Sequence, residues 1–229
     1  MKLAVMQPYL FPYIGYFQLI YASDLFIIYD DVSYIKQGYI NRNNILSLNG
    51  PVRFTVPVPG ASSNKLISEL SYSTDVIKVL KTVQQSYSKS PYFDEIYPLI
   101  ESILLYQNRG IAEVCLKSYQ DILKYLGLQR KFLKSSELDY DRALPAKDRL
   151  ISFSHKFGAD CYINTPGGRE LYNKLDFAKQ AVDLKFIDSL SIRYEQGVEG
   201  FVPNLSIIDV LMNCSIDEIK KLLLLFKLS

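Results

Sequence analysis

Residues 7–16, QPYLFPYIGY, include the residue types that a phosphate-bearing ligand needs. They follow a short apolar run, and the spacing of apolar residues from Tyr13 onward predicts a helix that starts near Tyr13. The free N–H groups at the start of a helix attract phosphate, and Gly15 lets a ligand come close to the backbone. The rings of Tyr13 and Tyr16 could stack on a ligand ring or donate to it, or they could pack within the fold. The residues that we expect to bind substrate here are Gln7, Tyr13, Gly15 and Tyr16.

A second group of polar residues follows the next apolar run, at residues 25–29. Asp30 or Asp31 could act as a general base that takes a proton from an amine or a hydroxyl. Lys36 and Arg42 could hold a phosphate or a carboxylate, and Asn43 lies beside them in the sequence. A salt-bridged surface loop is the alternative for each single member of this group.

The segment TPGGR, at residues 165–169, combines two glycines and an arginine before a predicted helix at 170–175. Successive N–H groups in such a turn can form a concave site for anions. The segment lacks the Lys-Ser/Thr ending of a P-loop, and a plain Pro-Gly-Gly turn explains its glycines equally well. The residues expected to contact substrate are Thr165, Gly167, Gly168 and Arg169.

The remaining reactive residue types exclude several classes of enzyme. His155 is the only histidine and lies in a predicted helix, so neither a catalytic triad nor a histidine-based metal site can be assembled. Cys115, Cys161 and Cys214 show no CxxC spacing, which predicts three buried thiols in a reducing compartment and no metal site. The role of Asp209 stays open between a buried structural partner and a catalytic acid.

The composition is that of an ordinary globular protein. The chain has 229 residues, of which 48% are apolar and 22% are charged, and its net charge is +2. This charge is too small to suggest binding to nucleic acid, and no run of residues has the length of a membrane span or the pattern of a signal peptide. We therefore expect a cytoplasmic protein, and the apolar run at residues 219–228 could lie in the core or form a homodimer surface.

The elements that must position these residues follow an α/β pattern. Strands at residues 2–6 and 25–29, with a helix from 13 to 21 between them, predict a βαβ unit and a parallel sheet. An edge strand is predicted at 52–58, and further strands at 131–133, 161–163 and 182–187. Helices are predicted at 76–87, 91–103, 111–126, 147–157, 205–212 and 215–228. We expect a single Rossmann-like α/β domain over residues 1–229, with a helical insertion at about 74–127 and a helical tail at about 204–229.

Two resemblances bear on function. Residues 13–16, Tyr-Ile-Gly-Tyr, resemble the His-x-Gly-His motif of the HIGH superfamily of nucleotidylyltransferases, with tyrosine in place of both histidines. A tyrosine offers only a neutral donor to a triphosphate, so this replacement weakens adenylyl transfer.

Across nearly its whole length, the chain also resembles the WbqC-like proteins of bacteria. The resemblance rests on QPYLFPYIGYFQLI, ASDLFIIYDDVSYIKQGYINRN, SPYFDEIYPLI, CYINTPGGRELY and LSIIDVLMN. It implies a role in surface-polysaccharide biosynthesis, particularly of O-antigen, as a transferase that places an acyl or aminoacyl group such as glycyl on a nucleotide-linked amino sugar. The matching positions are Gln7, Pro8, Phe11, Pro12, Gly15, Tyr16, Asp30, Asp31, Lys36, Arg42, Asn43, Gly168, Arg169 and Asp209.

Three functions therefore compete. The first is the transferase, with the phosphates of its sugar nucleotide on the predicted helix N-terminus and on Arg42 or Arg169. The second is an ATP-using ligase or nucleotidylyltransferase, which would need Mg²⁺ and would release pyrophosphate. The third is a non-catalytic protein that binds a nucleotide-linked sugar.

Overall fold

A six-stranded sheet organises the protein, whose computed structural model describes residues 1–229. The strand order is β5-β2-β1-β6-β7-β8, and all strands are parallel except β8, which runs antiparallel to β7. This is the order of a doubly wound Rossmann sheet with an antiparallel edge strand, so the predicted fold class is confirmed. The strands are β1 (Lys2–Met6), β2 (Leu25–Ile28), β5 (Lys131–Lys134), β6 (Cys161–Asn164), β7 (Asp183–Ser189) and β8 (Phe226–Leu228).

Helices cover both faces of this sheet. Successive residues of a strand point to opposite faces, so Leu3 and its partner Leu25 lie in one apolar cluster while Ala4 and Phe26 lie in the other. Helices α5 (Ala146–Lys156) and α6 (Lys174–Ala178) complete the smaller cluster of 13 buried residues. Helix α1 (Ile14–Ala22) and the helical insertion complete the larger one, of 46. Burial on both faces explains the almost continuous apolar runs in β1 and β2.

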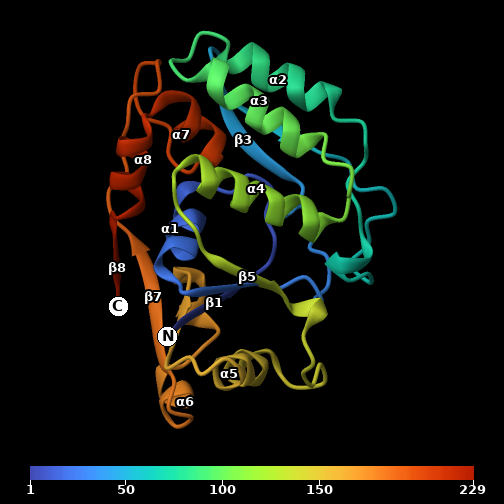
Figure 1. Ribbon diagram of the computed structural model, residues 1–229, viewed down its shortest axis with the longest axis vertical. Coiled ribbons are helices and arrows are strands. Elements are labelled where there is room, and N and C mark those ends of the chain that lie inside the picture. Colours follow the sequence, from blue (N-terminus) through green and yellow to red (C-terminus); the bar gives the residue numbers. More distant parts are fainter.

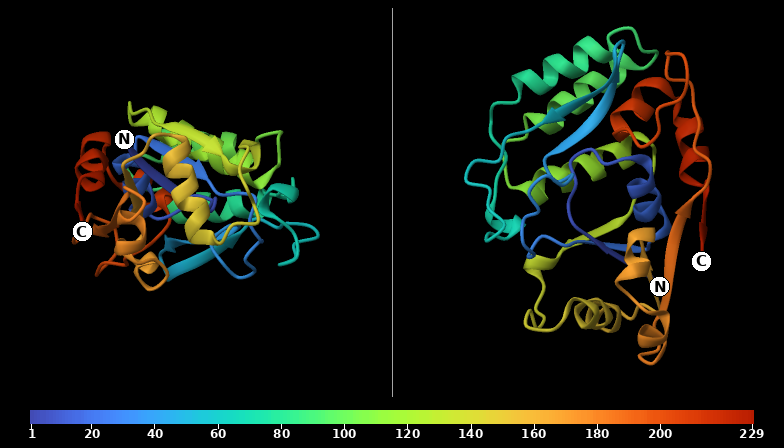
Figure 2. Two further views of the ribbon diagram at one scale, coloured as in Figure 1. Left: turned by 90° about the horizontal axis from the view of Figure 1, so that it is seen from below. Right: turned by 180° about the vertical axis from the view of Figure 1, so that it is seen from behind.

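The helical insertion and a separate hairpin occupy one end of the molecule, with α5 and α6 at the other (Figure 1). The insertion consists of α2 (Ile77–Tyr87), α3 (Phe93–Leu104) and α4 (Ile111–Tyr125). Strands β3 (Arg42–Ser47) and β4 (Gly50–Thr55) pair only with each other, and β3 packs against α2 (Figure 2). The alternative of a surface loop therefore does not hold for Arg42 and Asn43, because these residues begin a strand whose partner comes only later in the chain.

Two helix predictions near the carboxyl terminus need correction. The structure has a 3₁₀ turn at Pro166–Glu170 and starts α6 at Lys174, because Asn173 caps that helix by accepting a 2.9 Å hydrogen bond from the N–H of Leu175. The predicted helix at 215–228 ends early, as α8 (Ile216–Leu223). The residues after it form β8, which pairs with β7.

The last two helices otherwise follow the prediction. Helix α7 (Ile207–Asn213) precedes α8, and Ser215 and Glu218 form the capping box that their spacing predicts. None of the eight α-helices combines the length and the apolar character needed to cross a lipid bilayer.

Candidate functional site

The carboxyl edge of the sheet contains the point at which the strand order reverses. After β1 the chain passes to α1 on one face, and after the neighbouring strand β6 it passes to α6 on the other. Ligands of open α/β sheets bind outside the carboxyl ends of the strands at such a switch point. Gln7 follows β1 there, Asp30 lies close after β2, and Thr165 follows β6.

A cleft of about 410 Å³ opens beside the start of α1, and we call it the α1 cleft. Tyr13, Ile14 and Gly15 line it at the start of α1. Ser189 lines it from the end of β7, and Arg193 and Tyr194 line it from the segment that follows. No side chain caps α1, and its first turn has no acidic residue. The start of α1 and Arg193, whose guanidinium lies 5.6 Å from the centre of the Phe201 ring, therefore line one cleft that suits anions.

Gly15 fits under the ring of Tyr13. A Cβ atom on residue 15 would lie 2.3 Å from Cε2 of Tyr13 and 3.1 Å from Oγ of Ser189. The ring of Tyr13 thus lies directly against the start of α1, and any larger residue at position 15 would have to displace it.

Tyr16 lies in the core rather than at the surface. Its hydroxyl donates a 2.7 Å hydrogen bond to the backbone oxygen of Gln7. The hydroxyl of Tyr119, from α4, accepts from the N–H of Tyr9 at 2.8 Å and lies 2.7 Å from its carbonyl oxygen. Burial raises the pKa of both Tyr16 and Tyr119. These two neutral tyrosines fix the loop between β1 and α1, so Tyr16 can act on a ligand only through that loop.

Asn43 also holds this loop. Phe11 has a φ angle of 45°, in the left-handed region that a bulky residue rarely adopts. Its carbonyl oxygen accepts a 2.8 Å hydrogen bond from Nδ2 of Asn43 and a 2.7 Å bond from the hydroxyl of Ser206. Such strain persists only where the surroundings over-determine it, and it is common at binding sites.

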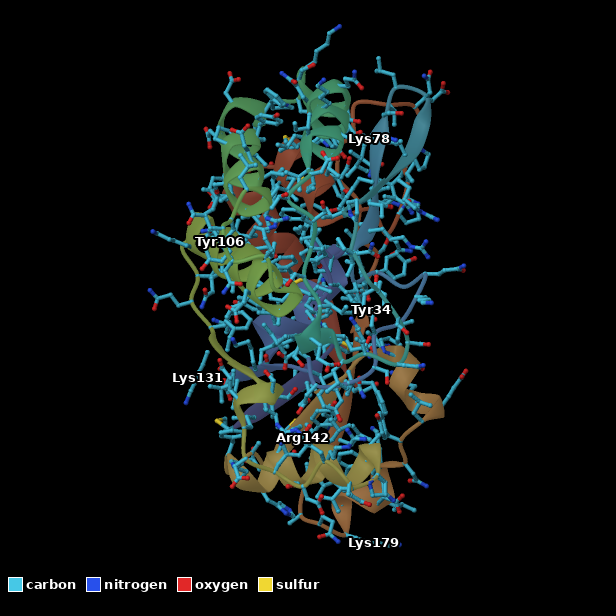
Figure 3. All side chains as sticks on the ribbon, turned by 90° about the vertical axis from the view of Figure 1, so that its right-hand side faces the viewer. Tyr34, Lys78, Tyr106, Lys131, Arg142 and Lys179 are labelled. Atoms are coloured by element: carbon cyan, nitrogen blue, oxygen red, sulfur yellow. The ribbon has the colours of Figure 1, made fainter.

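Asp30 and Asp31 are almost fully buried in a network at the ends of β2 and β5. Oδ2 of Asp30 accepts a 2.7 Å hydrogen bond from the hydroxyl of Ser136, and Oδ1 accepts from the N–H of the same residue at 2.9 Å. Oδ2 of Asp31 accepts from the hydroxyl of Tyr140 at 2.7 Å and from Nε of Arg142 at 2.9 Å. Arg142 lies beside α5 (Figure 3). Both carboxylates are thus held rigidly, and the half-buried Ser136 separates Asp30 from solvent.

Two side-chain atoms at the carboxyl ends of β1 and β2 have no hydrogen-bond partner although they are buried. They are Oε1 of Gln7 and the hydroxyl oxygen of Tyr29. Gln7 directly follows Met6, and Tyr29 directly follows Ile28. Met6 and Ile28 are paired across β1 and β2, so Gln7 and Tyr29 are neighbours just beyond the two strands. The guanidinium of Arg149 lies 5.9 Å from the ring of Tyr29. Buried polar atoms of this kind are usually satisfied by water or a ligand.

The other predicted cations lie apart from the α1 cleft. Lys36 is exposed, and Nε of Arg42 donates to the backbone oxygen of Gly38 at 3.1 Å, which closes its own loop. Arg169 donates to both carboxylate oxygens of Asp188, at 2.7 and 2.8 Å, and this contact raises the pKa of Arg169. The structure therefore does not bring Arg42 or Arg169 to the start of α1.

The loop after β6 is compact. A Cβ atom on Gly168 would lie 2.6 Å from Nδ2 of Asn164, whereas Gly167 has no heavy atom within 4 Å of that position. Gly168 thus makes room for the Asn164 side chain, which in turn accepts a 2.7 Å hydrogen bond from the N–H of Thr165. Close packing within the loop accounts for one of its two glycines.

Asp209 is a fully buried structural partner with three donors. Its carboxylate accepts from the hydroxyls of Tyr87 at 2.6 Å and Tyr194 at 2.7 Å, and from Nε2 of Gln196 at 3.0 Å. Burial raises the pKa of Asp209. The network ties the segment after β7 to α2 and α7.

The reactive residues outside these networks are isolated. His155 is exposed, and its Nε2 lies 2.7 Å from the backbone oxygen of Gln180. Cys115 and Cys214 are buried as predicted, but Cys161 is only partly buried because it begins β6. No three His, Cys, Asp or Glu side chains come together in an arrangement that could hold a metal ion.

Sequence reasoning missed Arg193 and Tyr194, which line the α1 cleft, and Tyr29 and Arg149 near the end of β2. Tyr29 ends the apolar run before Asp30, and that pattern predicts only a strand residue there. Arg193 follows a strand by only a few residues, and that position at a carboxyl edge was the signal that could have identified it.

Comparison with known proteins gives a family match over nearly the whole chain. The model of the WbqC-like protein family matches residues 7–221. An uncharacterized protein of Mycobacterium tuberculosis is 31% identical over 217 residues, which cover 93% of each of the two chains. No solved structure matches the chain at a significant level.

Proposed function

Because the chain belongs to the WbqC-like protein family, we propose that it is a transferase of surface-polysaccharide biosynthesis that acts on a nucleotide-linked amino sugar. The transferred group is an acyl or aminoacyl group such as glycyl, and the acceptor is the amine of the sugar. The family resemblance supports the link to polysaccharides, and the α1 cleft supports a phosphate-bearing ligand.

The observation that carries this proposal is the anion-suited α1 cleft at the carboxyl edge of a Rossmann-ordered sheet. The uncapped start of α1 offers N–H groups to a diphosphate, and Arg193 adds a positive charge to the lining of the same cleft. Tyr194 and Phe201 extend the same lining with aromatic surface. A diphosphate that carries a ring on each side matches this lining.

In the proposed reaction, the amine nitrogen of the sugar forms a bond with the acyl carbon. The bond from that carbon to the leaving group of an activated donor breaks, and the leaving group keeps the electron pair. The amine loses a proton, so a base is needed near the nitrogen.

Asp30 and Asp31 are the proposed source of that base, with Asp30 acting through Ser136. The hydroxyl of Ser136 can accept the proton from the amine and pass its own proton to Oδ2 of Asp30, 2.7 Å away. Asp31 then keeps this arrangement rigid through Tyr140 and Arg142. Strand β2 is separated from β7 by β1 and β6, which is roughly 14 Å at ordinary strand spacing. An extended nucleotide-linked sugar bridges that distance.

Binding is tested first, by thermal unfolding with UDP-glucosamine, UDP-N-acetylglucosamine, or ATP with Mg²⁺. A ligand at 100 times its Kd adds about 2.7 kcal/mol, which raises the Tm of a protein of this size by roughly 5 to 10 °C. We expect the largest shift with the free amine of UDP-glucosamine. A shift with ATP alone would favour the ligase, and stabilisation by sugar nucleotides without turnover would favour a binding protein.

Variants then locate the bound phosphates. Arg193→Gln is expected to weaken binding of UDP-glucosamine by about 10-fold or more, because it removes a charge-assisted contact. Arg53→Gln, on the exposed face of β4, is the matched control and should leave the affinity unchanged. Equal effects of the two substitutions would place the phosphates elsewhere.

Catalysis is tested by incubating the protein with UDP-glucosamine and an activated glycyl or acyl donor, and measuring the mass of the sugar nucleotide. Ser136→Ala should lower turnover without changing the affinity for UDP-glucosamine. Ser102→Ala, at an exposed serine of α3, is the control. No mass increase with any donor would contradict the transferase.

A further inference from the structure

A second cleft, of about 300 Å³, lies beside the α1 cleft, and we call it the tyrosine cleft. It is lined by Tyr9, Pro12, Tyr13, Tyr39, Asn43 and Asn204. Tyr13 and Asn204 also line the α1 cleft, so the two spaces are neighbours that share a wall. A ligand that extends past Tyr13 from the α1 cleft would enter the tyrosine cleft.

Three tyrosine rings give this cleft an aromatic surface with open hydroxyls. The centroids of Tyr9 and Tyr39 are 6.1 Å apart, and their planes are inclined by 52°. The hydroxyls of Tyr9, Tyr13 and Tyr39 make no hydrogen bond within the chain, in contrast to those of Tyr16 and Tyr119. Burial raises the pKa of Tyr9 and Tyr13, so these two hydroxyls are neutral donors at neutral pH.

Beyond the three tyrosine hydroxyls, the cleft offers few polar groups to a ligand. No charged side chain lines it, and the amide of Asn43 is already occupied by the carbonyl of Phe11 and the N–H of Asn44. Asn204 is therefore the one side-chain amide left open. A pyranose ring carries several hydroxyls that need partners, whereas a nucleobase presents a flat face that stacks on an aromatic ring.

We propose that the tyrosine cleft binds the nucleobase of the nucleotide-linked substrate, with Tyr9 and Tyr39 as its stacking surfaces. This inference rests on the proposed function, because it places the diphosphate at the start of α1 and the base on the other side of Tyr13. The sugar then has to extend from the start of α1 toward Ser136, where the proposed base lies.

The two stacking residues differ in exposure and in how their backbones are held. The N–H of Tyr9 is bonded to Tyr119, so its ring stands on a fixed backbone. Tyr39 is 54% exposed and comes from the irregular segment between β2 and β3. Tyr9 thus provides the rigid platform, and Tyr39 is the residue that can close over a bound base. Tyr39 can also be replaced without opening the core.

The experiment is isothermal titration of the full chain with each common ribonucleoside diphosphate, and with inorganic pyrophosphate as the probe that lacks a base. Tyr39→Leu is expected to weaken the tightest nucleoside diphosphate by about 5-fold to about 150-fold, the range for loss of one stacked base. Tyr39→Phe should stay within about 2-fold, because it keeps the ring. Binding of pyrophosphate should be the same in all three proteins.

Tyr106→Leu is the matched control. Tyr106 is 36% exposed and lies in the connection between α3 and α4. Figure 3 shows it on the opposite side of the molecule from Tyr34, which belongs to the same segment as Tyr39. Its replacement should leave nucleotide affinity unchanged.

The outcomes separate this inference from the proposed function. If Tyr39→Leu binds nucleoside diphosphates like Tyr106→Leu, while Arg193→Gln still weakens them, the base lies elsewhere and only the inference fails. If Tyr39→Leu weakens UDP-glucosamine but not UDP, the cleft holds the sugar and the base assignment is wrong. If the wild-type chain binds no nucleotide, the proposed function fails and the inference fails with it.

Discussion

The hydroxyl of Tyr194 donates a 2.7 Å hydrogen bond to Oδ2 of Asp209, which joins the wall of the α1 cleft to a fully buried carboxylate. Gln196 adds a bond to the same oxygen and also holds both backbone groups of Val202. The irregular segment that carries Arg193 therefore has a fixed shape although it belongs to no helix or strand. A rigid wall of this kind lowers the entropy lost when a ligand binds.

Tyr194→Phe tests this connection. It removes a hydrogen bond to a charged acceptor and should lower the free energy of unfolding by about 1.5 to 3 kcal/mol, measured by urea denaturation. Tyr125→Phe is the control, because the hydroxyl of Tyr125 lies 3.2 Å from Glu95 near the surface. Equal losses in the two variants would show that Asp209 does not depend on Tyr194.

The raised pKa of Asp209 predicts a pH dependence of stability. A carboxyl group whose pKa is higher in the folded state stabilises the protein fully below its unfolded value of 3.8, and this contribution is lost as pH rises through the folded pKa. The free energy of unfolding of the wild type minus that of Asp209→Asn should therefore fall as pH rises above about 4. Urea denaturation of both proteins from about pH 4 to about pH 7 measures this difference in the free energy of unfolding. A difference that grows with pH would mean that the three donors outweigh burial.

Substitution of Gly15, in the first turn of α1, is matched by substitution of Gly167, in the turn after β6. Gly15→Ala forces the Tyr13 ring away from the helix, so it should weaken binding of UDP-glucosamine by about 10-fold. This corresponds to a loss of roughly 1.4 kcal/mol of binding free energy. Gly167→Ala meets no neighbouring atom and should leave binding unchanged. Titration calorimetry compares the two. Unchanged affinity in Gly15→Ala would remove Tyr13 from the binding site.

The two neighbouring aspartates should respond differently to substitution. Asp30→Asn is expected to lower turnover by about 100-fold or more, as loss of a general base does, because Asp30 contacts the Ser136 hydroxyl. Asp31→Asn should mainly lower stability, by about 1.5 to 3 kcal/mol, because it loses the charged contact with Arg142. Turnover and urea denaturation are measured for both variants and for the double variant. Full activity in all three would exclude a catalytic role for this pair.

Thiol reactivity should differ among the three cysteines. Burial raises the pKa of Cys115 and of Cys214 to about 12, so almost no thiolate forms at neutral pH. Cys161 is partly exposed and should be the first to be alkylated by iodoacetamide. Mass spectrometry of peptides from the native protein gives the order. Early labelling of Cys115 would reveal opening of the core around Tyr72 and Tyr119.

Much of the fold could be predicted because the decisive signals are local. Leu25–Ile28 is a run of four apolar residues, which a strand buried on both faces requires. Pro8 ends the first strand, and Ser215 with Glu218 starts α8 through their own side chains. Strand β8 could not be predicted in this way. Its apolar residues continue the pattern of α8, and only pairing with the distant Ile187 makes them a strand.

The candidate site was predictable in part for the same reason. Gly15 and Tyr13 were identified because they follow a strand and start a helix. Tyr39 and Arg193 come from segments that reach the start of α1 only after the chain has folded, and no spacing in the sequence relates them to it. The buried position of Tyr16 was equally hidden, since tyrosines suit a binding surface and a core alike.

The central position of β1 also affects how the chain can fold during synthesis. Leu3 pairs with Leu25 on one side and with Tyr162 on the other, so its second neighbour emerges from the ribosome much later. At about 5 to 20 residues per second, roughly 8 to 30 s separate the two strands. Helix α5 covers the face of the sheet on which Leu3 lies, and it is also synthesised late in that interval. A nascent chain that ends before β6 therefore exposes an unpaired apolar strand edge, and such an edge favours aggregation until β6 is synthesised.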